Sequence, residues 1–181
     1  MNPKNIYRDC YRESDYKMGP DRRARMNAAI RATGCSRSML DVGCGRGELL
    51  DDHSDEFRLC MGAEIVPELC DGRWVIEIGS VTQLPWGANA FELVVCADVL
   101  EHIPPGDSEQ ALRELWHVAD RALILHVAWF SHKWKLPNGE MIDLHCNKRE
   151  MDEWLQLISR VLSPTKVISE TFGRCGLVVI S

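Results

Sequence analysis

Residues 39–50 read Met39-Leu40-Asp41-Val42-Gly43-Cys44-Gly45-Arg46-Gly47-Glu48-Leu49-Leu50. A short apolar run is followed by three glycines at alternate positions and then by the start of a helical pattern. Glycine has no Cβ, so the backbone can turn sharply there and a ligand can lie against it. The stretch therefore predicts a buried strand, a glycine turn and a helix, with a ligand at the turn.

The glycine spacing, G-x-G-x-G, differs from that of a dinucleotide-binding turn. That turn has the spacing G-x-G-x-x-G, with a helix N-terminus facing a pyrophosphate. Here Glu48 takes the place of the third glycine. A phosphate would meet the carboxylates of Glu48 and Asp41, which Arg46 alone does not offset. A ligand with an ammonium or sulfonium charge and no phosphate suits this turn better.

Three further segments follow the glycine turn in an ordered series. They are Cys60-Met61-Gly62-Ala63-Glu64-Ile65; Ile78-Gly79-Ser80-Val81 with Leu84-Pro85; and Phe91-Glu92-Leu93-Val94-Val95-Cys96-Ala97-Asp98-Val99-Leu100-Glu101-His102-Ile103. Together with the glycine turn they resemble, in order, the motifs of class I S-adenosylmethionine (SAM) dependent methyltransferases, of the small-molecule type (methyltransferase domain 11-like). The resemblance covers roughly Met39 to His126.

This resemblance implies a fold and a cofactor. The fold is α/β, a three-layer αβα sandwich with a Rossmann-like, seven-stranded, mostly parallel sheet whose last strand is antiparallel. The cofactor is SAM, and the product is S-adenosylhomocysteine. Alternating strands and helices with apolar central strands independently favour a parallel sheet covered on both faces.

Ligands of such a sheet bind at the carboxyl ends of its strands. We expect Asp41 to help hold the cofactor's amino group, although it could instead cap the glycine turn. Glu64 resembles the acid that holds the ribose hydroxyls, although it could be an ordinary strand-end carboxylate. Ser80 departs from the family, which often has an aspartate near the adenine. The predicted cofactor-binding residues are Asp41, Gly43, Cys44, Gly45, Gly47, Glu64, Ile65, Ser80, Val81, Ala97, Asp98 and Val99.

An insert at residues 129–147 and the V-L-E-H segment provide the residues predicted for the acceptor side. Trp129, Phe130 and Trp134 could stack on a planar substrate, and a histidine could take its proton. The alternative is a surface loop whose aromatic side chains cover the core edge. The predicted catalytic residues are His102, His132 and His145.

Metal binding is not predicted. His132, His145 and Cys146 lack the spacing of a known metal motif, and none of the eight cysteines forms a C-x-x-C pair. Methyl transfer also needs little acid–base help when the acceptor is a good nucleophile, because alignment with the sulfonium supplies most of the catalysis.

The length of 181 residues predicts one domain over residues 1–181, with an N-terminal arm and helix at 1–34 as a candidate lid. The net charge of −6 argues against a broad phosphate-binding surface. The N-terminus does not resemble a signal peptide, and apolar runs long enough to span a membrane are absent. A cytoplasmic protein with a small-molecule acceptor and no membrane partner is therefore expected.

Two other functions remain open. The amino-methylating and cytosine-C5 DNA enzymes are excluded, because their N/D-P-P-Y and Pro-Cys motifs are absent. An RNA- or other nucleic-acid-directed methyltransferase is possible but not favoured, because the basic and aromatic run His132-Lys133-Trp134-Lys135 is short and the net charge is −6. A non-catalytic SAM-binding regulator would keep the same cofactor residues. Oxygen, nitrogen and carbon acceptors are equally compatible with the sequence.

Helix starts are predicted from capping patterns. Asp21 is expected to cap the first long helix, Asp107 with Gln110 the next, and Asn147 with Glu150 the last. The predicted strands are 38–42, 59–65, 74–78, 91–97, 122–128, 166–171 and 177–180. The last two are close enough in sequence to form a hairpin.

Overall fold

The structure is a computed structural model that describes residues 6–9, 17–69, 72–136 and 138–181. Its helices are α2 (Pro20–Ala32), α3 (Glu48–His53), α4 (Ser108–Val118) and α5 (Met151–Leu162), with short 3₁₀ turns η1 (Pro67–Leu69), η2 (Leu100–His102) and η3 (Pro105–Asp107). Its strands are β1 (Ser38–Val42), β2 (Leu59–Glu64), β3 (Ile76–Ile78), β4 (Phe91–Ala97), β5 (Ala119–Ala128), β6 (Lys133–Lys135), β7 (Met141–Asp143), β8 (Val167–Phe172) and β9 (Cys175–Ile180).

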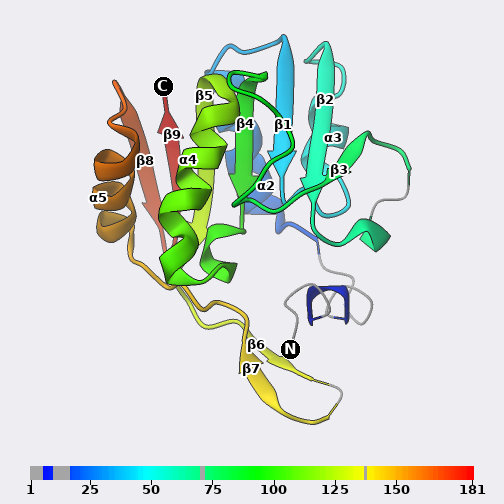
Figure 1. Cartoon of the computed structure of the whole chain (residues 1–181), viewed down its shortest axis with the longest axis vertical. Helices are drawn as coiled ribbons and strands as arrows, with labels where there is room; N and C mark the ends of the chain where they lie inside the picture. Colours follow the sequence, from blue (N-terminus) through cyan, green and yellow to red (C-terminus); the bar gives the residue numbers. More distant parts are fainter. Residues whose placement is uncertain (1–5, 10–16, 70–71, 137) are drawn as a thin grey trace.

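Seven of these strands form one sheet in the order β3-β2-β1-β4-β5-β9-β8 (Figure 1). Strands β1 to β5 pair in parallel, whereas β9 runs antiparallel to both of its neighbours. The predicted fold class is therefore confirmed, including the reversed last strand. The hairpin between β8 and β9 makes this reversal possible, because so short a connection cannot return the chain to a parallel strand.

Helices cover both faces of the sheet (Figure 1). Helices α4 and α5 pack on one face in a core around Trp154, and α2 and α3 pack on the other around Met26 and Leu50. Every residue of β1 is buried. A strand buried on both faces reads as a continuous apolar run, which is why β1 and β4 were predicted with the bounds observed.

Two of the three predicted helix caps are wrong, and the third, Asp107, takes the N-cap position without the predicted side-chain hydrogen bond. The N-cap of α2 is Gly19, with Asp21 in the first turn. Asp107 adopts a helical backbone conformation because η3 runs directly into α4, and its side chain makes no capping hydrogen bond. Helix α5 has a capping box formed by Glu150 and Glu153. Asn147, predicted as a cap, is buried and donates from Nδ2 to the Leu100 carbonyl (2.9 Å).

The insert after β5 forms a hairpin that the sequence did not predict. Strands β6 and β7 pair antiparallel in a two-stranded sheet of their own. In Figure 1 this hairpin and the helical residues 6–9 both lie beyond the carboxyl ends of the parallel strands. Among the described residues, none of the helices is long and apolar enough to cross a membrane.

Candidate active site

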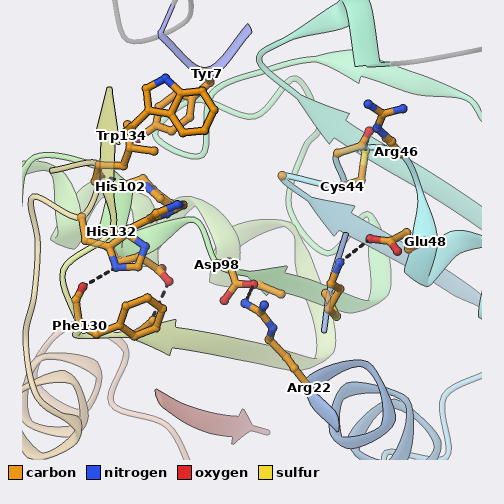
Figure 2. A pocket seen from close by; sticks show the side chains of 18 residues that line it. Tyr7, Arg22, Cys44, Arg46, Glu48, Asp98, His102, Phe130, His132 and Trp134 are labelled. Atoms are coloured by element: carbon orange, nitrogen blue, oxygen red, sulfur yellow. Dashed lines mark hydrogen bonds and ion pairs between the residues drawn. The ribbon is translucent and has the colours of Figure 1, made fainter. Parts of the chain in front are cut away.

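A cavity of about 330 Å³ lies at the carboxyl ends of β1 and β4 (Figure 2). It has a volume in the range of small-molecule sites. Its lining comes from the glycine turn, the end of β4, η2, the insert and the N-terminal segment. The lining residues are Tyr7, Met18, Arg22, Gly43, Cys44, Gly45, Arg46, Glu48, Ala97, Asp98, Glu101, His102, Ala128, Phe130, His132, Trp134, Leu144 and His145.

The glycine turn needs its glycines for both conformation and space. Gly43, Gly45 and Gly47 have φ values of 76°, 52° and 80°, which side chains rarely adopt. A Cβ on Gly43 would overlap a methyl group of Val99, and one on Gly47 would lie 2.7 Å from Trp74 Cδ1. The turn therefore brings bare backbone to the cavity wall.

The two acids predicted to bind the cofactor lie behind this turn. The Glu64 carboxylate accepts backbone N–H groups of Gly45 (2.9 Å), Ile65 (2.8 Å) and Val66 (3.0 Å). Burial, together with the charges of Glu64 and Glu48, raises the pKa of Asp41 to about 7. Both side chains are buried and neither lines the cavity, so in this structure Glu64 holds the turn in place.

Asp98 links the end of β4 to the N-terminal helix. Its backbone is left-handed (φ 58°), which is strained for a residue other than glycine. Its carboxylate accepts a hydrogen bond from His126 Nδ1 (2.6 Å) and pairs with Arg22 (Figure 2). Burial would raise its pKa, but the hydrogen bond from His126 and the charges of His126 and Arg22 outweigh it and lower the pKa. Asp98 is therefore an ionised group at the middle of the cavity.

The three predicted catalytic histidines meet at the far side of the cavity. Their ring centroids lie 4.6 Å (His102–His145), 5.3 Å (His132–His145) and 6.4 Å (His102–His132) apart. Burial, reinforced by His145, lowers the pKa of His102 to about 4, and burial also lowers that of His145. Both rings are therefore neutral at pH 7.

Asp143, at the end of β7, fixes two of these histidines. Its Oδ1 accepts the backbone N–H groups of His132 (3.0 Å) and His145 (3.1 Å). Its Oδ2 accepts from the Lys148 ammonium (2.7 Å). Burial opposes its ionisation, but the Lys148 hydrogen bond and the other donors lower its pKa. One carboxylate thus ties the two ends of the insert together.

Aromatic side chains enclose the histidines. The Tyr7 ring packs edge-on against His102 (5.3 Å between centroids), and Phe130 lies 4.9 Å from His145. Trp134 also lines the cavity, and its buried indole N–H has no hydrogen-bond partner among the described residues. Trp129, predicted as a stacking residue, instead packs against the core.

The N-terminal segment contributes residues that sequence reasoning missed. The Met18 N–H donates to Glu48 Oε2 (2.9 Å), and both Met18 and Arg22 line the cavity. Neither residue lies in a recognisable motif, so no local pattern could have identified them. Tyr11 and Tyr16, also part of the predicted arm, lie outside the described residues. The lid role of the arm stays a prediction.

Comparison with known proteins identifies the family. Residues 40–122 match the Methyltransf_11 family model, described as a methyltransferase domain. This matched segment is similar to the class I S-adenosylmethionine-dependent methyltransferases that the sequence resembles. The match supports the predicted family, and solved structures of the same fold that hold SAM support the predicted cofactor.

A curated relative and several solved structures agree with this assignment. Ajmaline N-methyltransferase of Rauvolfia serpentina is 25% identical over 119 residues, which cover 59% of this chain. The match spans only 40% of that relative's length. DhpI in complex with SAM and HEP superposes with a TM-score of 0.76 at 14% identity, covering 98% of this chain and 94% of DhpI. A SAM-dependent methyltransferase from Archaeoglobus fulgidus gives a TM-score of 0.68 at 18% identity, covering 87% of this chain and 91% of its own. At these identities the solved structures show the fold.

Within the methyltransferase domain, the predicted cofactor residues divide into two groups. The cavity lining includes Gly43, Cys44, Gly45, Ala97 and Asp98. The remaining predicted residues lie outside the lining: Asp41, Gly47, Glu64, Ile65, Ser80, Val81 and Val99. Ser80 is exposed and its hydroxyl contacts the Thr82 hydroxyl (2.9 Å). The roles of both groups in cofactor binding stay predictions.

Proposed function

We propose that this methyltransferase domain moves the methyl group of SAM to a small-molecule acceptor bound beside the histidine cluster. One observation carries the proposal. A single cavity has the glycine turn at one end and an aromatic and histidine wall at the other (Figure 2). Donor and acceptor would therefore share one enclosed space.

The cofactor end suits a cationic ligand. Asp41 and Glu64 stand behind the turn, and the ionised Asp98, which pairs with Arg22, lies next to it at the middle of the cavity. We assign Asp41 to the electrostatic attraction of the SAM amino group. We assign Glu64 to the ribose hydroxyls, for which its carboxylate would give up a hydrogen bond from a backbone N–H. The bare backbone at Gly43 and Gly45 leaves room for the methionine part of the cofactor.

The acceptor end suits a compact, partly aromatic molecule. Tyr7, Phe130 and Trp134 offer ring faces, and the free indole N–H of Trp134 offers one hydrogen bond. His102, with its low pKa, suits accepting a hydrogen bond better than storing a proton. Burial lowers the pKa of His145 as well, so we assign general-base work to His132. Tyr7 completes this wall from the N-terminal arm, which supports the lid role of the arm.

The transfer itself is a displacement at the methyl carbon. The acceptor atom forms a bond to that carbon, and the bond to the sulfonium sulfur breaks. S-Adenosylhomocysteine leaves as a neutral thioether, and any proton on the acceptor goes to a histidine or to water. Alignment within the cavity supplies most of the rate gain.

The arrangement of side chains on β6 disfavours a nucleic-acid acceptor. Strand alternation leaves Lys133 and Lys135 exposed while Trp134 is half buried against the cavity. A platform for single-stranded nucleic acid needs its aromatic and basic side chains on one accessible surface. A non-catalytic regulator would share the cofactor end, so only turnover separates it from the enzyme.

The test combines calorimetric titration with a turnover assay. We expect SAM and S-adenosylhomocysteine to bind with micromolar affinity and NAD not to bind. Gly45→Trp should abolish SAM binding. Trp134→Ala should change SAM affinity by less than about threefold, or under 1 kcal/mol, while reducing turnover in an acceptor screen.

Lys135→Ala is the matched control on the same strand, and it should behave as the parent chain does. Normal SAM binding by Gly45→Trp would show that the cofactor site is misplaced. SAM binding without turnover across a broad acceptor screen would favour the regulator.

A further inference from the structure

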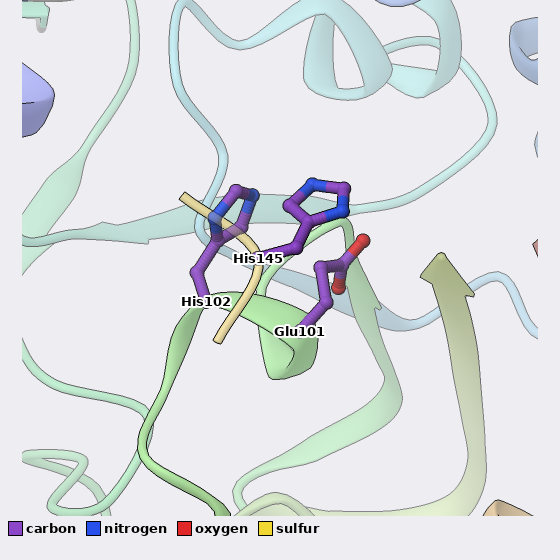
Figure 3. A group of neighbouring side chains, drawn as sticks. All are labelled: Glu101, His102 and His145. Atoms are coloured by element: carbon purple, nitrogen blue, oxygen red, sulfur yellow. The ribbon is translucent and has the colours of Figure 1, made fainter. Parts of the chain in front are cut away.

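Three potential metal ligands converge on one point of the acceptor wall. Glu101, His102 and His145 each offer a ligand atom, and these atoms all lie within 4.8 Å of one another (Figure 3). Glu101 and His102 come from η2, whereas His145 comes from the insert. All three line the cavity.

Glu101 is a buried carboxyl group in which only one of the two oxygens has a hydrogen-bond partner. Its side chain is fully buried, and Oε1 accepts the backbone N–H of Ala128 (3.1 Å). Oε2 is buried without a hydrogen-bond partner among the described residues. An unpaired buried carboxyl oxygen is costly, and a metal ion that displaces the carboxyl proton would give it a partner.

The two histidines each use one ring nitrogen on a backbone carbonyl, which leaves the other nitrogen without a proton. His102 Nδ1 lies 3.0 Å from the Leu144 carbonyl, and His145 Nδ1 lies 2.8 Å from the Phe130 carbonyl. A carbonyl oxygen only accepts, so each Nδ1 carries the proton and each Nε2 carries a lone pair. Metal-bound histidines are held in this way by a hydrogen bond from the second ring nitrogen.

We propose that Glu101, His102 and His145 bind a divalent transition-metal cation, with Zn²⁺ the best match to the donors. Two imidazoles and one carboxylate form a known ligand set for zinc and for non-haem iron. Tetrahedral ligands with bonds of about 2.0–2.1 Å lie about 3.3 Å apart, so the cluster would contract on binding. From the sequence alone, His132, His145 and Cys146 are considered as metal ligands and are not predicted to be a site. The proposed set shares only His145 with that group.

With three protein ligands, a bound zinc ion would have a fourth coordination position for water or substrate, and all three ligands line the cavity. Resting on the proposed function, this position would take an acceptor hydroxyl oxygen and lower its pKa, as zinc does for water. The hydroxyl proton goes to solvent, the oxygen bonds to the methyl carbon, and the carbon–sulfur bond breaks to leave the thioether. The acceptor class is then a hydroxyl compound methylated on oxygen.

The test titrates the full chain, free of any histidine tag, with Zn²⁺ and with Co²⁺ followed by visible absorption. We expect one equivalent to bind with micromolar or tighter affinity, without a thiolate charge-transfer band. Glu101→Gln and His145→Gln should each weaken binding by more than about 100-fold, since losing a ligand costs more than losing its outer partner.

Two control variants make the outcome decisive. Cys146→Ser removes the neighbouring thiol, and His117→Gln removes a histidine on α4; both should bind as the parent does. No binding by the parent chain, or equal binding by Glu101→Gln, overturns the metal site. Retained SAM binding in every variant shows folding, and separates failure of the metal site from failure of the proposed function.

Discussion

At the scale of single residues, the site is marked by carboxyl groups that the fold buries at a cost. Asp41 and Glu101 are both buried, and burial raises the pKa of each. Structural stability alone would favour apolar residues at such positions. Perturbed carboxyl groups beside a cavity are typical of functional sites.

The variant Asp41→Asn tests whether the buried carboxyl group lowers stability in return for a role in the site. The folded pKa of about 7 lies above the usual value of 3.8, so the fold favours the protonated form of Asp41. Ionised Asp41 destabilises the folded protein. The loss of folding stability caused by Asp41 grows as pH rises from about 3.8 to about 7, and it levels off above pH 7. At pH 8 we expect Asp41→Asn to raise stability by on the order of 2 kcal/mol, with no gain at pH 4.

The same variant should bind SAM more weakly. A bound ammonium favours the charged carboxylate, so parent affinity should rise from pH 6 to pH 7.5 with proton release, seen by calorimetry in buffers of different ionisation enthalpy. Asp41→Asn should lose both the rise and the proton release. An unchanged pH profile would remove Asp41 from the cofactor site.

At the scale of elements, the β6–β7 insert is held by a few polar contacts at its base. Asp143 binds the backbone of both His132 and His145, and His102 Nδ1 bonds to the Leu144 carbonyl of the same insert. The insert therefore behaves as a unit that carries the acceptor wall. It has little apolar core of its own.

Asp143→Ala should release this unit without harming the sheet. We expect acceptor turnover to fall by about 100-fold, the cost of a misplacement near 1 Å, while SAM affinity stays within about threefold. Glu140→Ala, at the turn of the hairpin, is the control and should leave turnover unchanged. Equal loss of SAM binding would show that Asp143 supports the whole fold and not the acceptor wall.

At the scale of the whole molecule, the parallel sheet places distant segments around one space. The carboxyl ends of β1 and β4 lie side by side because those strands pair in register, with Val42 opposite Cys96. Tyr7 and Met18 of the N-terminal segment and side chains of the insert then line the cavity from outside the sheet. Ligand binding should therefore be coupled to global stability.

Thermal unfolding measures this coupling. At 100 times its dissociation constant, SAM should add about 2.7 kcal/mol, or about 5–10 °C in Tm for a domain of this size. S-Adenosylhomocysteine should act alike, and NAD should give no shift. Absence of a shift with SAM, at a concentration that saturates binding by calorimetry, would mean that the unfolded chain binds equally well.

The sequence by itself determined the sheet, the glycine turn and the family. Apolar strands and glycines with positive φ are local constraints, so β1 and β4 could be predicted to the residue. It did not determine helix caps such as that of α5, because Asn147 finds a distant partner in Leu100.

Only the tertiary structure determines which residues lie next to His102 and His145. His102 and His145 are far apart in sequence, and their meeting with Glu101 depends on where the insert folds back. Arg22 likewise reaches Asp98 across the fold. Such contacts are set by packing between elements, which residue spacing along one chain does not encode.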